Sequence, residues 1–399
     1  MASSRGRFLG FLVFSSILVG VISPCARADV MYTVLDLGTL GGESYASGVN
    51  NLGQVVGYCF GANNSCHMFR TGPNQPINPA TDDLGSFDSN NANYGNIAYG
   101  INDLGQVVGY TSAPNGDIHA FRTNSPISLL SSDLGTGAPL GPAEPSFAQA
   151  CCINDKGQAA GDFLGSNGYE AFRTPSGRAM DPNLDDLGSL AGRKTMAFGI
   201  NNSGQVVGYS QLQGQDHAYR TLPNQAINPA TDDLGTLGGQ NSKAYGINEL
   251  GQVVGGAQDA NGNAHAFRTA PNQPINAKTD DLGVLPGYEL SVAAAINNLG
   301  QVVGGCDETA FTPIGSYPTA QEEPFIYGNG VMKDLNGLID PNSGWRLVDA
   351  QGINDLGQIV GYGYYKGGMQ EAYLLTPVPE PAVVALLVLG GLAALRRRA

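Results

Sequence analysis

The chain has 399 residues and a net charge of −14, from 34 acidic and 20 basic residues. It offers no excess of basic side chains to neutralise phosphates, which argues against nucleic acid as a partner. Hydrophobic residues make up 42% of the chain and glycine occupies 57 positions, a composition that excludes a disordered chain and favours many short strands joined by tight turns.

Residues 1–28 have the organisation of a secretory signal peptide, which we expect to be helical. Two arginines make a basic start, the apolar run FLGFLVFSSILVGVI follows, and Ala26 and Ala28 mark a small-x-small cleavage site. Cys25 would suit a lipoprotein signal, but Pro24 stands where such signals place a small flexible residue. We therefore predict cleavage after Ala28.

One ten-residue phrase recurs along the rest of the chain. It reads INDLGQVVGY from Ile101 to Tyr110 and is found, little altered, in seven copies whose asparagines lie 47 to 57 residues apart. The asparagines that mark the copies are Asn50, Asn102, Asn154, Asn201, Asn248, Asn297 and Asn354. A period near 50 residues is typical of a repeat architecture, which overrides the two or three domains that length alone would suggest.

Each repeat is predicted to carry four short strands. In the second copy we expect them at IAYGI, QVVGY, HAFRT and around the DLG at Asp133. Asn102 and Gly105 fit the first and fourth positions of a hairpin turn between the first two strands, because Asn bonds the backbone two residues on and Gly accepts a positive φ. The acidic residues at the second turn position are interpreted as solvated turn residues: Asp103, Asp155, Glu249 and Asp355.

Four strands in about 50 residues match one blade of a β-propeller. We therefore predict an all-β fold over residues 29–376, a seven-bladed β-propeller of four-stranded blades. The chain opens with a fourth strand at Asp36 and closes with a third strand at Glu371, so the N-terminal strand would complete the last blade and close the ring. The first strand of each blade would then lie at the axis, which suits small residues such as Ala98 and Gly100.

These phrases resemble the HAF-repeat family of extracellular bacterial proteins, through His119-Ala120-Phe121 and its equivalents. The resemblance covers nearly all of residues 31–376. It weakens in the third repeat, where AAGD from Ala159 to Asp162 replaces VVGY, and in the sixth, where the HAF phrase becomes Glu-Pro-Phe. The resemblance implies export and an extracellular location, and it implies no settled biochemical activity.

Repeated polar residues are interpreted as scaffold. The histidines His67, His119, His217 and His265 all hold the same place in the third strand. Such positions lie far apart around a ring and cannot converge on one metal ion, so we expect each to bond a turn or a neighbouring blade. The arginines of the same phrase are expected to pair with the DLG aspartates. The sequence lacks GxxxxGK, HExxH, GxSxG and EF-hand patterns, and we predict no catalytic, cofactor-binding or metal-ligating residues.

Cysteines do depart from the repeat. Export would permit disulfides, and Cys59 and Cys66 flank one hairpin loop, so we predict a bridge between them. The pairing of Cys151, Cys152 and Cys306 is left open, although adjacent free thiols are favoured over a strained Cys151–Cys152 bridge. Because the predicted mature chain has five cysteines, at least one would stay free or pair between molecules.

Loop lengths supply the functional hypothesis. The turn between the first two strands never changes length, whereas the connection from the second to the third strand expands in the sixth repeat. The expanded loop carries the candidate binding residues Asp307, Glu308, Phe311, Tyr317 and Glu322. Variable loops over a rigid scaffold often bind ligands, so we expect a binding or structural module that recognises polysaccharide or protein. The alternative is an extracellular lyase or hydrolase acting at the axial mouth.

Residues 377–399 form a separate C-terminal segment. The apolar run from Ala382 to Leu395 has 14 residues, fewer than the roughly 20 that span a bilayer comfortably, and we expect it to be helical. An ordinary tail anchor is one reading. The residues Val378, Pro379, Glu380, Pro381, Arg396, Arg397 and Arg398 together resemble the PEP-CTERM sorting signal of Gram-negative bacteria. That resemblance implies transient residence in the inner membrane, removal of the tail by an exosortase, and release to the cell surface or extracellular matrix.

Overall fold

The structure is a computed structural model that describes residues 31–61, 65–87, 95–123, 132–137, 146–166, 168–192, 194–307 and 323–379. The expected signal peptide, with Ala26 and Ala28, lies outside these ranges. The C-terminal residues Glu380, Pro381 and Arg396 to Arg398 lie outside them as well. Within the described ranges, no helix is both long and apolar enough to cross a bilayer.

Residues 31–379 form one unit, which consists of small antiparallel sheets. The first three sheets in chain order contain β2 (Ser44–Val49), β3 (Val55–Phe60) and β4 (Cys66–Arg70); β5 (Ile97–Ile101), β6 (Val107–Ser112), β7 (Ile118–Thr123) and β8 (Asp133–Gly135); and β9 (Ala148–Ile153), β10 (Ala159–Gly165) and β11 (Gly168–Thr174). The next three contain β12 (Thr195–Ile200), β13 (Val206–Leu212) and β14 (Gln215–Arg220); β15 (Gly238–Ile247), β16 (Val253–Asp259) and β17 (Ala264–Arg268); and β18 (Leu290–Ile296), β19 (Val302–Asp307), β20 (Glu323–Gly328) and β21 (Val331–Asp334). Two short helical segments, α1 (Pro182–Asp185) and the 3₁₀ turn η1 (Asn336–Leu338), lie between strands.

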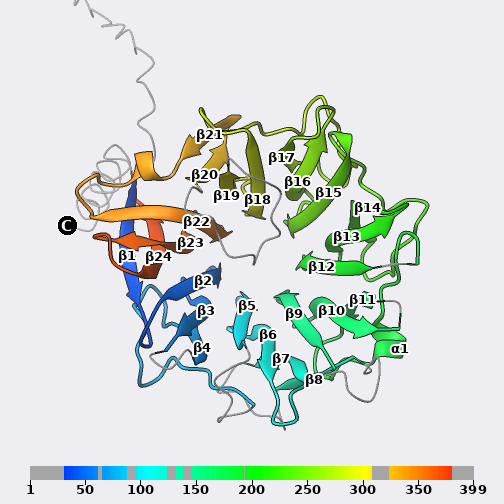
Figure 1. The fold of residues 1–399 in the computed structure, drawn as a ribbon, viewed down its shortest axis with the longest axis horizontal. Helices are drawn as coiled ribbons and strands as arrows, with labels where there is room; N and C mark the ends of the chain where they lie inside the picture. The colour runs from blue at the N-terminus through cyan, green and yellow to red at the C-terminus, as the bar shows by residue number, and fades with distance from the viewer. Residues whose placement is uncertain are drawn as a thin grey trace, which may run out of the picture. The chain divides into compact units, whose positions relative to one another are not determined.

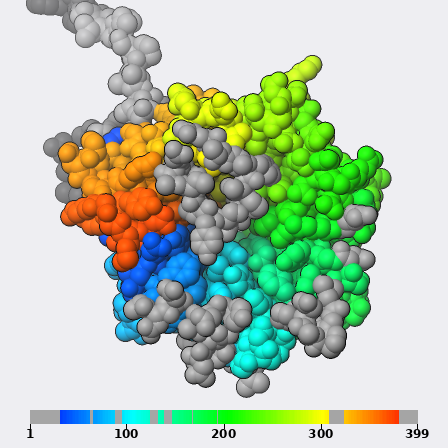
Figure 2. Space-filling view, viewed as in Figure 1, coloured from blue at the N-terminus to red at the C-terminus, as the bar shows by residue number. Residues whose placement is uncertain are grey.

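The seventh sheet joins the two ends of the unit. Its strand order is β1 (Tyr32–Gly38), β24 (Gln370–Pro377), β23 (Ile359–Tyr365) and β22 (Trp345–Ile353). β1 runs antiparallel to β24, with Asp36 opposite Tyr373 and Gly38 opposite Ala372, as the strand order in the sequence predicts. Figure 2 shows this neighbourhood directly, with N-terminal residues in blue beside C-terminal residues in orange and red.

The sheets surround a common centre, and the innermost strands are β2, β5, β9, β12, β15, β18 and β22 (Figure 1). Small residues are required there, as predicted. A Cβ added to Gly48 would lie 3.2 Å from the carbonyl oxygen of Tyr99 in the neighbouring sheet, and one added to Gly352 would lie 3.4 Å from the Cα of Gly48. The inner strands therefore approach one another backbone to backbone, and larger side chains would separate them.

The repeated HAF and VVGY phrases form the core of each sheet. The aromatic residue of HAF is fully buried in every copy: Phe69, Phe121, Phe172, Tyr219, Phe267, Phe325 and Tyr373. It lies against the glycine of the second strand, since a Cβ on Gly109 would come within 2.8 Å of the Phe121 ring and 1.9 Å of the Ile97 carbonyl oxygen. Burial of a large aromatic side chain against bare backbone explains why these residue types recur together.

The prediction of four full strands in every sheet is wrong for four of the sheets in the described part of the chain. There the DLG segment forms a single antiparallel bridge, for example between Phe69 and Asp83, instead of a strand. The chain turns immediately before each bridge: the Asp82 amide donates to the Asn78 carbonyl at 2.9 Å, and equivalent bonds precede the other three bridges. This turn replaces the extended backbone that precedes Asp36 in β1.

Candidate functional site

The repeated turn is organised by its buried asparagine. In the first copy, Asn50 Oδ1 accepts hydrogen bonds from the amides of Leu52 and Gln54, at 3.1 and 2.9 Å. Its Nδ2 donates to Gln54 Oε1 at 2.9 Å, which accounts for the glutamine that follows the glycine in each copy. Gly53 adopts a φ of +77°, and its six equivalents are also positive. The turn predicted from Asn and Gly is therefore confirmed.

The same asparagines link neighbouring sheets in a closed cycle. Nδ2 of each donates to the main-chain carbonyl of the next asparagine along the chain, at 2.9–3.1 Å. The last link returns from Asn354 to Asn50. Each asparagine is at most 4% exposed, so each uses both its amide and its carbonyl groups inside the protein.

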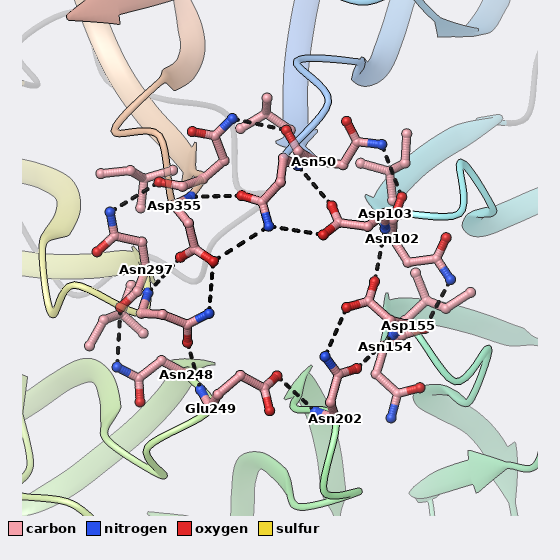
Figure 3. A pocket seen from close by; sticks show the side chains of 18 of the residues that line it. Asn50, Asn102, Asp103, Asn154, Asp155, Asn202, Asn248, Glu249, Asn297 and Asp355 are labelled. Atoms are coloured by element: carbon pink, nitrogen blue, oxygen red, sulfur yellow. Dashed lines mark hydrogen bonds between the residues drawn. The ribbon is translucent and has the colours of Figure 1, made fainter.

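A second cycle runs through the next residue of each turn. Its main-chain amide donates to the side-chain oxygen of the equivalent residue in the following sheet, at 2.8–2.9 Å. The participants are Asn51, Asp103, Asp155, Asn202, Glu249, Asn298 and Asp355. The acidic members are turn residues as predicted, with Glu249 exposed and the others half-buried. They also accept hydrogen bonds between sheets, which the sequence did not indicate. Figure 3 shows both kinds of link around the opening.

The two cycles surround a cavity of about 180 Å³ at the centre of the unit. Apolar residues such as Ile101 and Ile353 line it together with the turn residues. Four carboxylate residues, Asp103, Asp155, Glu249 and Asp355, also line it, and no lysine or arginine is among its described lining residues. Carboxylates that line an opening without a cationic group beside them in the lining give it a negative potential. We call the end of the unit that carries this cavity and the seven turns the turn rim.

Each histidine of the HAF phrase makes a repeated polar contact, as predicted, and its partner is an aspartate that also accepts the amide of the turn glycine two residues later. Each histidine contacts the DLG aspartate of its own repeat, and Nδ1 of His119 lies 3.0 Å from Asp133 Oδ1. The other pairs are His67 with Asp83, His217 with Asp233 and His265 with Asp281. The aspartate raises the pKa of His119, and equivalent partners raise the pKa of His217 and His265.

The prediction that the arginines pair with these aspartates is wrong. Arg70 Nη1 instead donates to the main-chain carbonyl of Gly105, at 2.6 Å, in the turn of the next sheet. The same contact recurs from Arg122, Arg173, Arg220 and Arg268 to the turn glycine of the following repeat. Arginine follows the histidine by three residues in one strand, so the two side chains project from opposite faces. Arg173 makes the same contact in the repeat where Glu170 replaces histidine. The arginines thus act as another set of links at the turn rim.

Asp162 is a buried carboxyl group whose environment the sequence did not reveal. It replaces the tyrosine of VVGY, a departure visible in the sequence that could have drawn attention to it, and it is fully buried in β10. Its Oδ1 accepts a hydrogen bond from Gln149 Nε2 at 3.1 Å, while Oδ2 has no hydrogen-bond partner among the described residues. Burial raises the pKa of Asp162 to about 7, although the Gln149 bond and the Lys194 ammonium group oppose the increase. It does not line the axial cavity.

The predicted disulfide between Cys59 and Cys66 is wrong, since all five cysteines of the described chain are free. The register places Cys59 opposite His67, and Cys66 opposite Phe60. The two cysteines therefore occupy adjacent rungs of the hairpin, and their side chains project from opposite faces. Cys59 is buried in a core cluster with Leu37 and Phe69, whereas Cys66 Sγ donates to the carbonyl of Asn96 in the next sheet.

The candidate binding loop is described at its first residue alone. Asp307 is the last residue of β19, and Glu308, Phe311, Tyr317 and Glu322 lie outside the described residues. Val378 and Pro379 end the described part of the chain, and the Val378 amide donates to the Met31 carbonyl at 2.8 Å. The sequence-based candidates are therefore not brought together into one described site, and the axial cavity is formed by residues that had been assigned to the scaffold.

No curated protein matches the chain. Among solved structures, a putative TolB from Agrobacterium tumefaciens is 12% identical, with a TM-score of 0.39, and the match covers 68% of this chain and 90% of that one. The BP39L lectin from Burkholderia pseudomallei is 10% identical, with a TM-score of 0.33, over 84% of this chain and 98% of the lectin. Residues 191–373 match the family described as "Protein of unknown function (DUF3466)".

Proposed function

We propose that this protein is an exported binding module, a closed seven-bladed propeller that recognises polysaccharide or protein through the rim opposite the turn rim. We call that opposite end the variable rim; it carries the connections from second to third strands and those that lead into first strands. The proposal extends to processing: a signal peptide cleaved after Ala28, and a PEP-CTERM-like tail that an exosortase removes at the inner membrane. The mature protein would then reside at the cell surface or in the extracellular matrix.

The observation that carries this proposal is the contrast between the two rims. The turn rim is held by two cycles of hydrogen bonds and by the arginine contacts, with turns of constant length. On the variable rim, residues 113–117 join β6 to β7, whereas residues 308–322 join β19 to β20. Binding sites are usually carried by variable loops on a rigid scaffold. The contrast therefore favours ligand recognition at the variable rim.

An extracellular lyase or hydrolase remains the competing proposal, and the axial carboxylates do not favour it. They hold repeated positions and accept hydrogen bonds from main-chain amides of the preceding sheet. Asymmetric chemistry needs residues that break the repeat, as Asp162 does. A carboxyl group with a pKa near neutrality is suited to general acid–base chemistry, so Asp162 is the residue on which the enzyme proposal would have to rest.

Glycan-array binding by the purified protein tests the proposal. Binding to a defined set of glycans should be lost when residues 307–321 are replaced by Asn-Gly, while the melting temperature stays unchanged because other repeats manage with short loops. Release of shortened glycans by the intact protein, abolished in Asp162→Asn, would favour the enzyme instead. Equal attachment of intact and trimmed proteins to cells and matrix would contradict recognition through this loop.

Processing is tested separately by mass spectrometry of the exported protein. We expect an N-terminus at Asp29 and no apolar C-terminal segment. Surface material that retains Arg396 to Arg398 would favour a plain membrane anchor. This result would leave the binding proposal intact, because it concerns where the protein is held and not what it recognises.

A further inference from the structure

An arc of exposed leucines accompanies the acidic opening of the turn rim. Five of the seven turns carry leucine at their third position: Leu52, Leu104, Leu250, Leu299 and Leu356. These side chains are 53–71% exposed. The order of the asparagine cycle places their turns on five consecutive sheets, from the sheet of β15 through the closure at Asn354 to the sheet of β5. Exposed apolar side chains gathered on one side of a protein often mark an interaction site.

The turn itself does not require leucine. The other two copies have Lys156 and Ser203 at the same position, and they close the same turn hydrogen bond, from Gly157 to Asn154 and from Gly204 to Asn201, both at 2.9 Å. None of the five leucines lines the axial cavity or belongs to a described core cluster. Neither folding of the turn nor packing of the core therefore explains the arc.

The acidic residues of the axial cavity indicate which kind of partner could bind at the turn rim. The leucines flank a cavity lined by Asp103, Asp155, Glu249 and Asp355 with no cationic lining residue. A second copy docked rim to rim would bring two sets of carboxylates together, and an anionic membrane would be repelled by the same groups. A partner that offers both apolar groups and a positive charge matches both features at once. Lysine and arginine side chains fit this description, because they place a cationic head at the end of an apolar stem.

We propose that the turn rim docks a polypeptide segment of a partner protein in which a lysine or arginine is flanked by large apolar side chains. The cationic group enters the axial cavity between the carboxylates, and the apolar side chains cover the leucine arc. The carboxylates steer the segment and select its charge, while burial of leucine supplies the affinity. This site lies on the rim opposite the one used in the proposed function, so the two proposals stand or fall separately.

Selection of random peptides displayed on phage, against the purified full chain, tests the proposal without a known partner. Counter-selection uses a serine variant in which all five arc leucines are replaced by serine, the residue that Ser203 already supplies at this position. We expect selected peptides to carry lysine or arginine beside apolar residues. Their affinity should fall by at least roughly tenfold on the serine variant, as at interface hot spots, and should weaken with added salt.

Two matched variants complete the test. An asparagine variant, with Asp103, Asp155, Glu249 and Asp355 replaced by the residue type found at Asn51 and Asn202, should weaken the same peptides. Leu184→Ser in α1, at a leucine that is 74% exposed outside the arc, should leave binding unchanged. If a variant has a lowered melting temperature, Leu299→Ser alone and the salt dependence on the unmodified protein provide the readout. Peptides that bind the serine variant equally well, or that are acidic, would overturn the proposal.

The other occupants have their own signatures, and each would also overturn the proposal. Flotation with neutral lipid vesicles that is lost in the serine variant, with no leucine-dependent peptide, would assign the rim to a membrane. A dimer in sedimentation that dissociates in the serine variant would assign it to a second copy of this chain.

Discussion

Asn354 donates a hydrogen bond from its side-chain amide to the main-chain carbonyl of Asn50 at 2.9 Å, across 304 positions of sequence. The contact joins the last turn of the unit to the first, and six equivalent contacts join the others. A second link follows directly, from the Asp355 amide to Asn51 Oδ1 at 2.8 Å. The first and last repeats are therefore held together by the same bonds that hold other neighbouring repeats.

Replacing Asn354 by alanine should destabilise the unit strongly. The substitution removes the bond to Asn50 and leaves the amides of Leu356 and Gln358 without their acceptor. Each buried group left unpaired costs about 1–3 kcal/mol, so we expect a loss of roughly 2–4 kcal/mol in the free energy of unfolding, measured by urea denaturation. Asn261→Ala, at an exposed turn asparagine, is the control and should change stability little.

Deleting residues 29–40 should lower the melting temperature sharply and promote aggregation. The deletion removes β1 and exposes the edge of β24, which then presents unpaired backbone groups. Removal of residues 380–399 is the control, because these residues contribute no described strand. A truncated protein that melts with the full chain would show that β1 pairing contributes little to stability.

Adjacent glycines in β19 should respond oppositely to alanine. A Cβ at Gly304 would lie 2.0 Å from the carbonyl oxygen of Val292, whereas the nearest atom to a Cβ at Gly305 is Asp349 Oδ1 at 3.8 Å. Gly304→Ala should cost at least about 3 kcal/mol, in the range of severe overpacking. Gly305→Ala should be neutral or slightly stabilising, by up to about 1 kcal/mol, because it restricts the unfolded chain. Thermal unfolding of the two variants under the same conditions tests this prediction, and equal melting temperatures would contradict it.

Asp162→Asn should stabilise the protein above neutral pH. Burial raises the folded-state pKa of Asp162 to about 7, above the unfolded value near 3.9. Stability is fully present below about pH 4 and is lost as the pH rises through the folded value, because the unfolded chain ionises first. The variant should therefore melt higher than the parent at pH 8 and similarly at pH 4. Glu289→Gln, at an exposed carboxylate, is the control and should leave the melting temperature unchanged at both pH values. If Asp162→Asn and the parent showed the same dependence of melting temperature on pH, Asp162 would not be a buried neutral acid.

The histidine–aspartate pairs should add stability at mildly acidic pH. Their aspartates raise the pKa of His119, His217 and His265 in the folded state. The stabilisation is present below the unfolded histidine pKa of about 6.5 and is lost as the pH rises through the higher folded values. Burial acts to raise the pKa of Asp233 and Asp281, but the hydrogen bonds from histidine and from the turn glycine outweigh it and lower the pKa. The stability that comes from these aspartates is therefore lost as the pH falls through their folded pKa.

Melting temperatures from pH 5 to 9, measured in the Asp162→Asn background, isolate the histidine effect. Replacing His119, His217 and His265 together by glutamine should flatten the decline of melting temperature between about pH 6 and 8. A decline that persists undiminished in this triple variant would mean that other groups govern the pH dependence.

Local patterns predicted the strands and turns because their causes are local. The Asn of each copy recurs because its side chain accepts hydrogen bonds from backbone amides of the turn, and the Gly recurs because it adopts a positive φ. Both requirements arise within the turn itself, so the sequence of one repeat is enough to predict them. The partners of longer side chains could not be predicted in this way. Arg70 was assigned to an aspartate by charge, but Asp83 is held by His67, and the arginine reaches the Gly105 carbonyl in the next repeat.

Contacts between strands and between repeats explain two further differences between the predictions and the structure. Cys59 and Cys66 are close in sequence, yet a pairing of Cys59 with His67 turns the two thiols to opposite faces of one hairpin. Asp103 was interpreted as a solvated turn residue because asparagine holds the same turn position in other copies. Its partner is the Asn51 amide in the preceding repeat, and such contacts exist only when seven similar turns are brought around one centre.

The sequence by itself determined the all-β character of residues 31–379 and the positions of the turns between the repeated strands, because repeated local patterns require them. The tertiary structure alone decided what happens between repeats: the two hydrogen-bond cycles, the acidic cavity that they surround, and the alignment of five leucines around it. Residues that are equivalent in sequence become neighbours in space only when the sheets assemble around a common centre. Their carboxylates then line one opening and together give it a negative potential, which a single hairpin with one carboxylate would not produce.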